Sequence, residues 1–244
     1  MADFYEEDLA YIHDTGHTEF ALKSAPGILN ILNRNRIDEG LIVDLGCGSG
    51  VWARELTKSK YRVLGIDISE SMIRIARRRA PGAEFRIGSL FEADIPPCDC
   101  VTSISECLNY LVDPGNHKQM LIRFFLRIYR ALVPGGLFIF DIAEPGQVRQ
   151  GIKARNFSEG EDWIVAIEKE ENRKQSILTR RITSFRKIGK YYRRSDELHR
   201  QRLYKAADVA GELRKAGFRV QVMRSYGEHP LPKNHAAFVA RKPV

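Results

Sequence analysis

Residues 41–50 have the sequence LIVDLGCGSG, in which a short apolar run leads directly into three glycines at alternate positions. So short and apolar a run is typical of a strand that is buried on both faces of a parallel sheet. Gly46, Gly48 and Gly50 can adopt positive φ and let a ligand approach the backbone closely. A helix that starts near Gly50 would add free N–H groups, which favour a carboxylate. The segment therefore predicts a strand, a ligand-binding loop and a helix.

Strand and helix patterns alternate on both sides of this loop. Strands are predicted at residues 41–45, 61–67, 84–88, 99–104, 137–142, 218–225 and 236–241. Helices are predicted from near residue 50, from Ser69 or Ser71 to Pro81, over 117–132 (stopped by Pro134-Gly135-Gly136) and over 206–216. Such alternation implies an α/β fold with a doubly wound, mostly parallel, seven-stranded sheet.

Two segments depart from the alternating pattern. Residues 1–39 predict an N-terminal helical cap, with Pro26 in the first turn of a helix. Residues 163–170, 177–187 and 191–203 predict three longer, more polar strands of an antiparallel insertion after the fifth strand. We therefore divide the chain into the cap, an α/β core, an insertion that forms a substrate wall or a dimer surface, and a C-terminal part of the core, over residues 1–39, 40–150, 151–204 and 205–244.

Composition limits the class of protein. The 244 residues are 43% hydrophobic and 29% charged, as in ordinary globular proteins with a substantial core. No apolar run approaches a membrane span, and the acidic N-terminus lacks the apolar segment of a signal peptide. We therefore expect a cytoplasmic protein, with no membrane partner, whose four cysteines are reduced thiols. No second cluster of cysteines and histidines has zinc-site spacing, so no metal is expected.

The glycine spacing and two acidic residues discriminate between candidate ligands. A dinucleotide-binding loop has its third glycine one residue after Gly50, where this chain has Val51. Asp44 precedes the loop and favours a cation over a pyrophosphate. Asp67 ends the next strand, where a carboxylate can accept both ribose hydroxyls of an adenosine. S-adenosylmethionine, which carries an ammonium and a sulfonium, therefore fits better than a nicotinamide dinucleotide.

Three motifs together resemble one family. Residues 43–50, VDLGCGSG, resemble motif I of the class I S-adenosylmethionine-dependent methyltransferases. Residues 65–72, GIDISESM, resemble the segment of that family that holds the ribose and the adenine, and residues 132–136, LVPGG, resemble the turn before its fifth strand. The resemblance covers about residues 40–145. It implies S-adenosylmethionine as cofactor and S-adenosylhomocysteine as product.

The resemblance also implies which residues bind the cofactor. The loop glycines would line its methionine part, Asp67 would bind the ribose, and Ile68 and Met72 would pack on the adenine. The family often has an acidic residue after its third strand, where this chain has Ser89 and Leu90. The Ser89 side chain can accept one hydrogen bond, and the Leu90 backbone N–H can donate one. The segment before motif I often covers the cofactor in related enzymes. The predicted cofactor-binding residues are Tyr11, Asp44, Gly46, Cys47, Gly48, Gly50, Asp67, Ile68, Met72, Ser89, Leu90 and Glu106.

The residues that act on the acceptor are less narrowly defined. A sulfonium is a good leaving group, so proximity and in-line orientation supply much of the catalysis, and a base is needed only for a protonated nucleophile. Glu106 is expected nearest the methionine end of the cofactor, and Asp141 or Glu144 can orient a substrate; loop caps are the alternative roles. The candidate catalytic residues are Glu106, His13, His17 and His199.

A basic segment leaves the acceptor open. Residues 180–194 hold seven basic residues, no acidic one and three aromatic ones. They can form a nucleic-acid face, a cradle for an anionic small molecule, or a solvated edge protected by charge. We predict methyl transfer to O or N of a small molecule, in a protein that can be a homodimer. One alternative is an RNA methyltransferase, although the sequence shows no separate RNA-binding module. The other is a non-catalytic cofactor-binding sensor.

Overall fold

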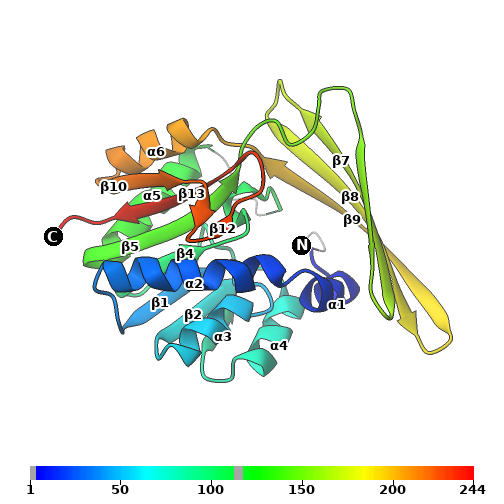
Figure 1. The fold of residues 1–244 in the computed structure, drawn as a ribbon, viewed down its shortest axis with the longest axis horizontal. Helices are drawn as coiled ribbons and strands as arrows, with labels where there is room; N and C mark the ends of the chain where they lie inside the picture. Colours follow the sequence, from blue (N-terminus) through cyan, green and yellow to red (C-terminus); the bar gives the residue numbers. More distant parts are fainter. Residues whose placement is uncertain (1–3, 113–117) are drawn as a thin grey trace.

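The predicted seven-stranded sheet forms the centre of the molecule (Figure 1). The computed structural model describes residues 4–112 and 118–244. The sheet consists of β1 (Leu41–Leu45), β2 (Arg62–Asp67), β3 (Glu84–Ile87), β4 (Cys98–Ser103), β5 (Leu132–Ala143), β10 (Arg219–Met223) and β13 (His235–Arg241). Its order is β10-β13-β5-β4-β1-β2-β3, and β13 runs in the direction opposite to the other six strands. The strand order reverses between β1 and β4, which is where open α/β sheets bind ligands.

Helices cover both faces of the sheet (Figure 1). One face carries α2 (Glu19–Arg34), α3 (Val51–Lys58) and α4 (Glu70–Arg79), and the other carries α5 (Lys118–Ala131) and α6 (Ala206–Lys215). Trp52 and Ile73 belong to the first core, and Phe125 and Leu213 to the second. Each such buried side chain contributes roughly 1.5–3 kcal/mol. No helix of the described residues is long and apolar enough to cross a membrane.

Two sequence predictions about this core were wrong in detail. Pro26 lies inside α2 rather than in its first turn. A proline there removes one helical hydrogen bond, and full burial of Ile28 and Leu32 on the same helix compensates. The fifth strand was predicted over 137–142, but β5 starts at Leu132. Pro134-Gly135-Gly136 therefore forms the irregular beginning of the strand, where its pairing with β4 shifts register. The predicted helix start at His117 lies outside the described residues, and so do residues 1–3.

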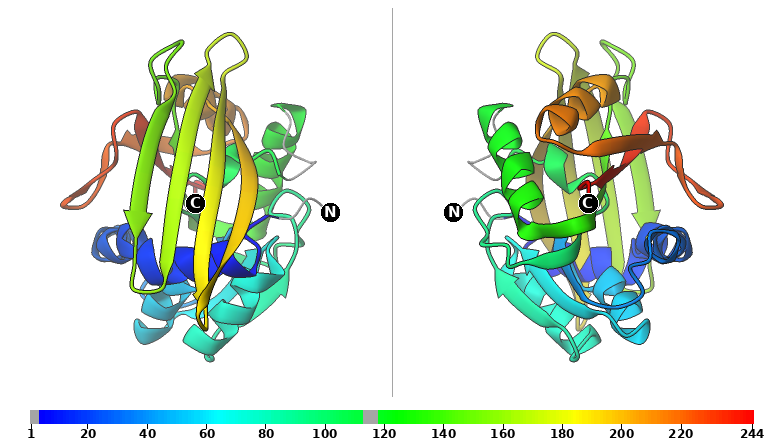
Figure 2. Two further views of the ribbon diagram at one scale, coloured as in Figure 1. Left: turned by 90° about the vertical axis from the view of Figure 1, so that its right-hand side faces the viewer. Right: turned by 90° about the vertical axis from the view of Figure 1, so that its left-hand side faces the viewer.

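The insertion is a separate antiparallel sheet beside the core (Figure 2). It consists of β6 (Ala154–Glu159), β7 (Trp163–Asn172), β8 (Ile177–Ile188) and β9 (Tyr191–Arg202), and we call it the insertion sheet. The sequence analysis missed β6, an edge strand whose one large apolar side chain, Phe157, is exposed. It also missed the short hairpin of β11 (Ser225–Tyr226) and β12 (His229–Pro230).

The helix α1 (Glu7–Gly16) joins the insertion sheet to the core (Figure 1). Leu9 and Ile12 of this helix pack against Trp163, Val165 and Ile182 of the insertion sheet in a small apolar cluster. This packing closes one side of the space between the two sheets, and that space contains the candidate site.

Candidate cofactor and acceptor site

The glycine loop follows β1 and forms an open backbone cradle. Gly46, Gly48 and Gly50 all have positive φ, as predicted, at 75°, 52° and 76°. A Cβ on Gly46 would lie 2.5 Å from the Sγ of Cys107, so the close packing there excludes any side chain. A Cβ on Gly48 would have no heavy atom of the described residues within 4 Å. The loop therefore presents bare backbone towards open space.

Asp67 stands at the end of β2 and faces this loop. Its Oδ2 accepts a hydrogen bond of 2.8 Å from the Gly48 N–H, and its Oδ1 accepts one of 2.9 Å from the Ser69 N–H. Burial raises the pKa of Asp67, and these backbone donors oppose the shift. Ser69 caps α4 by accepting from the Met72 N–H, as predicted. The carboxylate thus joins the glycine loop to the start of α4 and lines the cavity.

Asp44 is a second buried carboxylate, near the end of β1. Its Oδ1 accepts a hydrogen bond of 2.7 Å from the Thr102 hydroxyl. Burial raises the pKa of Asp44 to about 7, against this hydrogen bond, and the charge of Asp67 adds to the increase. A cationic ligand beside Asp44 would stabilise its ionised form. The position therefore suits an ammonium group.

A cavity of about 310 Å³ extends from the glycine loop to the insertion sheet. Nine of the twelve predicted cofactor-binding residues line it: Asp44, Gly46, Cys47, Gly48, Asp67, Ile68, Met72, Leu90 and Glu106. Its other walls come from residues 4 and 5, from α1 and from the inner face of the insertion sheet. A ligand on the loop would therefore face the inner face of the insertion sheet across the same cavity.

The other three predicted cofactor-binding residues lie outside the cavity lining. The Tyr11 hydroxyl donates to Asp162 at 2.9 Å, so Tyr11 joins α1 to the insertion sheet instead of covering a ligand. The Ser89 hydroxyl accepts from the backbone N–H groups of Phe91 and Glu92 and caps its own turn. Gly50 is the residue before α3, and a Cβ there would lie 2.9 Å from that of Ala76.

Residues 4–6 cover the cavity by contacting the insertion sheet and the N-cap of α4. The backbone N–H groups of Tyr5 and Glu6 donate to the Glu197 carboxylate at 2.8 and 3.1 Å. The Tyr5 carbonyl accepts from the Ser69 hydroxyl at 2.9 Å. Sequence analysis did not find Glu197, because it alternates on β9 with the apolar Leu198, and this pattern predicts that Leu198 points inward, whereas Leu198 is exposed and Glu197 is buried.

All three candidate histidines line the cavity. Burial, with a smaller contribution from His17, lowers the pKa of His13 to about 4, and burial also lowers that of His17. The His199 Nε2 lies 2.8 Å from a Glu197 carboxylate oxygen. The buried His199 Nδ1 has no hydrogen-bond partner among the residues that the structure describes. A histidine that is oriented by a carboxylate through one nitrogen has the geometry of a general base at the other.

Glu106 lines the cavity but is held in an ion pair. Its Oε1 lies 2.8 Å from the Arg180 Nη2, and its Oε2 lies 3.6 Å from the His235 Nε2. Burial alone would raise the pKa of Glu106, but Arg180 and His235 hold it well below its ordinary value. Glu106 is therefore a permanent anion, which makes it a poor proton acceptor.

Asp141 and Glu144 have structural contacts instead of facing a substrate. The Asp141 carboxylate accepts from the backbone N–H groups of Ser105 and Glu106 at 3.0 and 2.7 Å and so fixes this loop. Glu144 accepts from the Ala206 N–H at 2.9 Å and pairs with Arg224. Neither lines the cavity among the described residues, so the alternative role as caps is the one observed.

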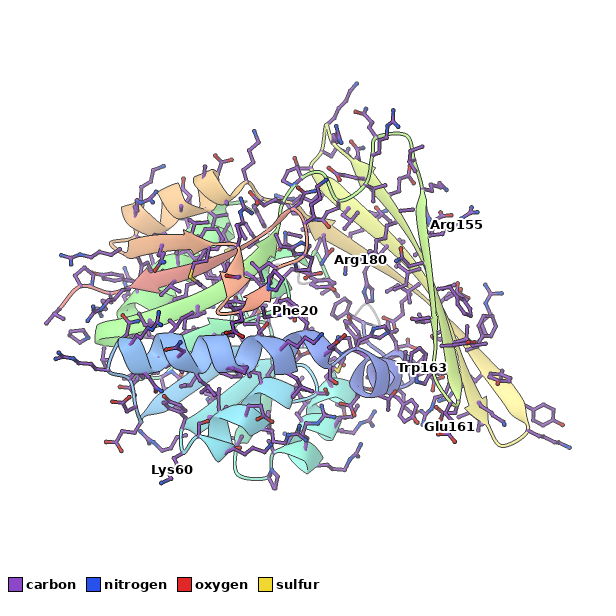
Figure 3. The ribbon with its side chains drawn as sticks, viewed as in Figure 1. Phe20, Lys60, Arg155, Glu161, Trp163 and Arg180 are labelled. Carbon is purple, nitrogen blue, oxygen red and sulfur yellow. The ribbon has the colours of Figure 1, made fainter. Side chains whose placement is uncertain are left out.

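The basic residues of 180–194 are largely neutralised within the protein. Arg186 and Arg193 pair with Asp8 of α1, and Arg194 pairs with Asp196 at 2.9 Å. Arg180 turns into the cavity (Figure 3). Most of the basic side chains of residues 180–194 thus form ion pairs with α1 or within the insertion sheet.

The fold and the site define an α/β protein in which a glycine loop and the acid at the end of the next strand line one cavity. A family model for a methyltransferase domain matches residues 42–136. A putative methyltransferase from Geobacillus sp. (strain WCH70) is 30% identical over 187 residues, which cover 73% of this chain and 74% of that protein. The chain belongs to the class I S-adenosylmethionine-dependent methyltransferases, and S-adenosylmethionine is its cofactor.

Solved structures agree with the fold over nearly the whole chain. An S-adenosylmethionine-dependent methyltransferase from Clostridium acetobutylicum ATCC 824 has a TM-score of 0.80 at 21% identity, over 96% of this chain and 98% of that one. The sugar N-methyltransferase KedS8 from Streptoalloteichus sp ATCC 53650 has a TM-score of 0.78 at 19% identity, over 100% of this chain and 94% of that one. At these identities the likeness shows the fold alone.

Proposed function

We propose that this chain transfers a methyl group to an oxygen or nitrogen of a small-molecule acceptor. The cavity is the observation that carries the proposal, because it runs from the glycine loop to the inner face of the insertion sheet. Residues 4–6 and α1 cover it, and its volume of about 310 Å³ falls within the range of small-ligand pockets. An acceptor beside the insertion sheet would face a cofactor on the loop directly.

The cavity residues divide into those that hold the cofactor and those that face the acceptor. Asp67 binds the ribose hydroxyls, Ile68 and Met72 pack on the adenine, and Asp44 stabilises the ammonium group. The bound cofactor supplies an electrophilic methyl group on a sulfonium. The protein excludes water and aligns the nucleophile, which is where much of the rate enhancement of an in-line transfer arises.

His199 accepts the proton of the acceptor in this proposal. Glu197 holds the His199 Nε2, so the lone pair is on the buried Nδ1 of a side chain that lines the cavity. Phe4 and Tyr5 pack against the imidazole with ring centroids 4.4 and 5.1 Å away, so the base is shielded from water. His13, whose low pKa makes it a weak base, forms part of the wall.

The test is production of S-adenosylhomocysteine with a panel of small amines, alcohols and acids, with RNA assayed in parallel. We expect turnover with a small acceptor, and a fall of about 100-fold or more in kcat for His199→Asn with cofactor affinity unchanged. His229→Asn, outside the cavity, is the matched control. Turnover on RNA alone would overturn the small-molecule proposal, and cofactor binding with no turnover on any acceptor would favour a sensor.

The location and assembly of the protein stay predictions. The four cysteines are free thiols, three of them buried, which fits the reducing cytoplasm. A homodimer through the exposed outer face of the insertion sheet is the assembly that the sequence suggests, and light scattering on the purified protein measures it.

A further inference from the structure

Three nitrogen-bearing side chains form one row across the inner face of the insertion sheet. In the strand register Lys169 of β7 is directly opposite Arg180 of β8, and Arg180 is directly opposite His199 of β9. All three line the cavity. Figure 3 shows Arg180 on the side of the insertion sheet that faces the core, whereas Arg155 lies on the opposite side. The row therefore stands across the cavity from the glycine loop.

The two cations in this row repel each other. Directly opposed like charges destabilise a sheet. Burial lowers the pKa of Lys169, the Arg180 charge lowers it further, and Glu106 opposes the shift. Glu106 pairs with Arg180 at 2.8 Å, but no ion pair or hydrogen bond joins Lys169 to any described side chain. Tyr110, whose hydroxyl lies 3.3 Å from the Arg180 Nη1, adds no charge because burial raises its pKa to about 12.

A donor in the row also lacks a partner. The Arg180 Nε is buried, and within the described part of the chain nothing accepts its hydrogen bond. A buried guanidinium normally has its donors satisfied, so an orphan at a cavity wall points to a ligand or an ordered water. Excess positive charge together with an unused donor is the complement of an anionic group.

We propose that Lys169 and Arg180 form an anion subsite that binds a carboxylate or phosphate group of the acceptor. This inference rests on the proposed function, because it specifies the chemical class of the acceptor for the same cavity. Arg180 presents a planar set of donors and Lys169 a flexible point charge, the usual combination for such anions. An anion there relieves the repulsion between the two cations and holds the rest of the acceptor beside His199, their neighbour in the row.

The experiment uses the full chain saturated with S-adenosylhomocysteine. Affinity for S-adenosylhomocysteine is measured first by calorimetry, and phosphate, pyrophosphate and malonate are then titrated at constant ionic strength. We expect Lys169→Met to weaken binding of the preferred anion by about tenfold or more, the value of one charge-assisted hydrogen bond. Lys187→Met, on the exposed outer face of the same hairpin, should bind the anion as the wild type does.

A second variant and the cofactor titration separate the outcomes. Arg180→Lys retains the charge beside Glu106, so the variant should fold. It loses the planar set of guanidinium donors, so it should also weaken anion binding. Absence of anion binding in the wild type, or equal affinity in Lys169→Met, would overturn the anion subsite. Failure of the wild type to bind S-adenosylhomocysteine would instead defeat the proposed function. A stronger response to pyrophosphate than to malonate would identify a phosphate-bearing acceptor, and the reverse a carboxylate-bearing one.

Discussion

Asp67→Asn should weaken cofactor binding while leaving the ligand-free protein folded. Asp67 offers two oxygens, which now accept from the Gly48 and Ser69 N–H groups and lie where the ribose hydroxyls would arrive. A hydrogen bond to a charged group contributes about 1.5–3 kcal/mol. Asparagine keeps one acceptor, so about one such bond is lost and Kd should rise roughly tenfold to 100-fold. Asp67→Ala loses both, and its Kd should rise by roughly 10² to 10⁴.

The stability of the ligand-free protein is expected to change little. Burial raises the pKa of Asp67, so Asp67→Asn removes the cost of burying a charge, but its Nδ2 cannot accept one of the two backbone hydrogen bonds, and the ligand-free Tm should stay close to that of the wild type. Calorimetry with S-adenosylhomocysteine and thermal melts measure the two quantities, with Asp94→Asn at an exposed position as control. A Kd within about threefold of wild type, or about 0.6 kcal/mol, in both variants would refute the reasoning. So would a fall in ligand-free Tm that parallels the loss of affinity, because it would mark Asp67 as a structural residue.

Two further predictions concern the same loop. Because burial raises the pKa of Asp44 to about 7, far above that of an unfolded aspartate, the ligand-free protein should lose stability as pH rises from about 4 to about 7. Asp44→Asn should flatten that slope in thermal melts, and an unchanged slope would argue against a buried, neutral Asp44. Gly46→Ala places a Cβ 2.5 Å from the Cys107 Sγ at a φ of 75°, so it should lower both the ligand-free Tm and cofactor affinity. Gly48→Ala, which meets no described atom within 4 Å, should lose affinity with a smaller loss of Tm, and equal losses in the two variants would contradict this geometry.

The core fold was predictable because its signals are local. Buried parallel strands are short apolar runs, and helices between them are marked by periodicity, caps and glycine or proline stops. The mostly parallel seven-stranded sheet, the positive φ of the loop glycines and the cap at Ser69 agree with these signals. β6 and the β11–β12 hairpin were missed because short or exposed strands carry little hydrophobic pattern.

The sequence by itself determined the sheet, the cofactor loop and the acid at the end of β2, since each depends on neighbouring residues in one strand–loop–helix unit. Only the tertiary structure decided which distant side chains meet across the cavity. Arg180 and Glu106 are 74 residues apart, and Tyr5 and Glu197 are 192 apart. Their pairing depends on how the insertion sheet packs on α1, which no local pattern encodes. The same packing turned Tyr11 away from the cavity, and the register of β7, β8 and β9 brought Lys169, Arg180 and His199 into one row.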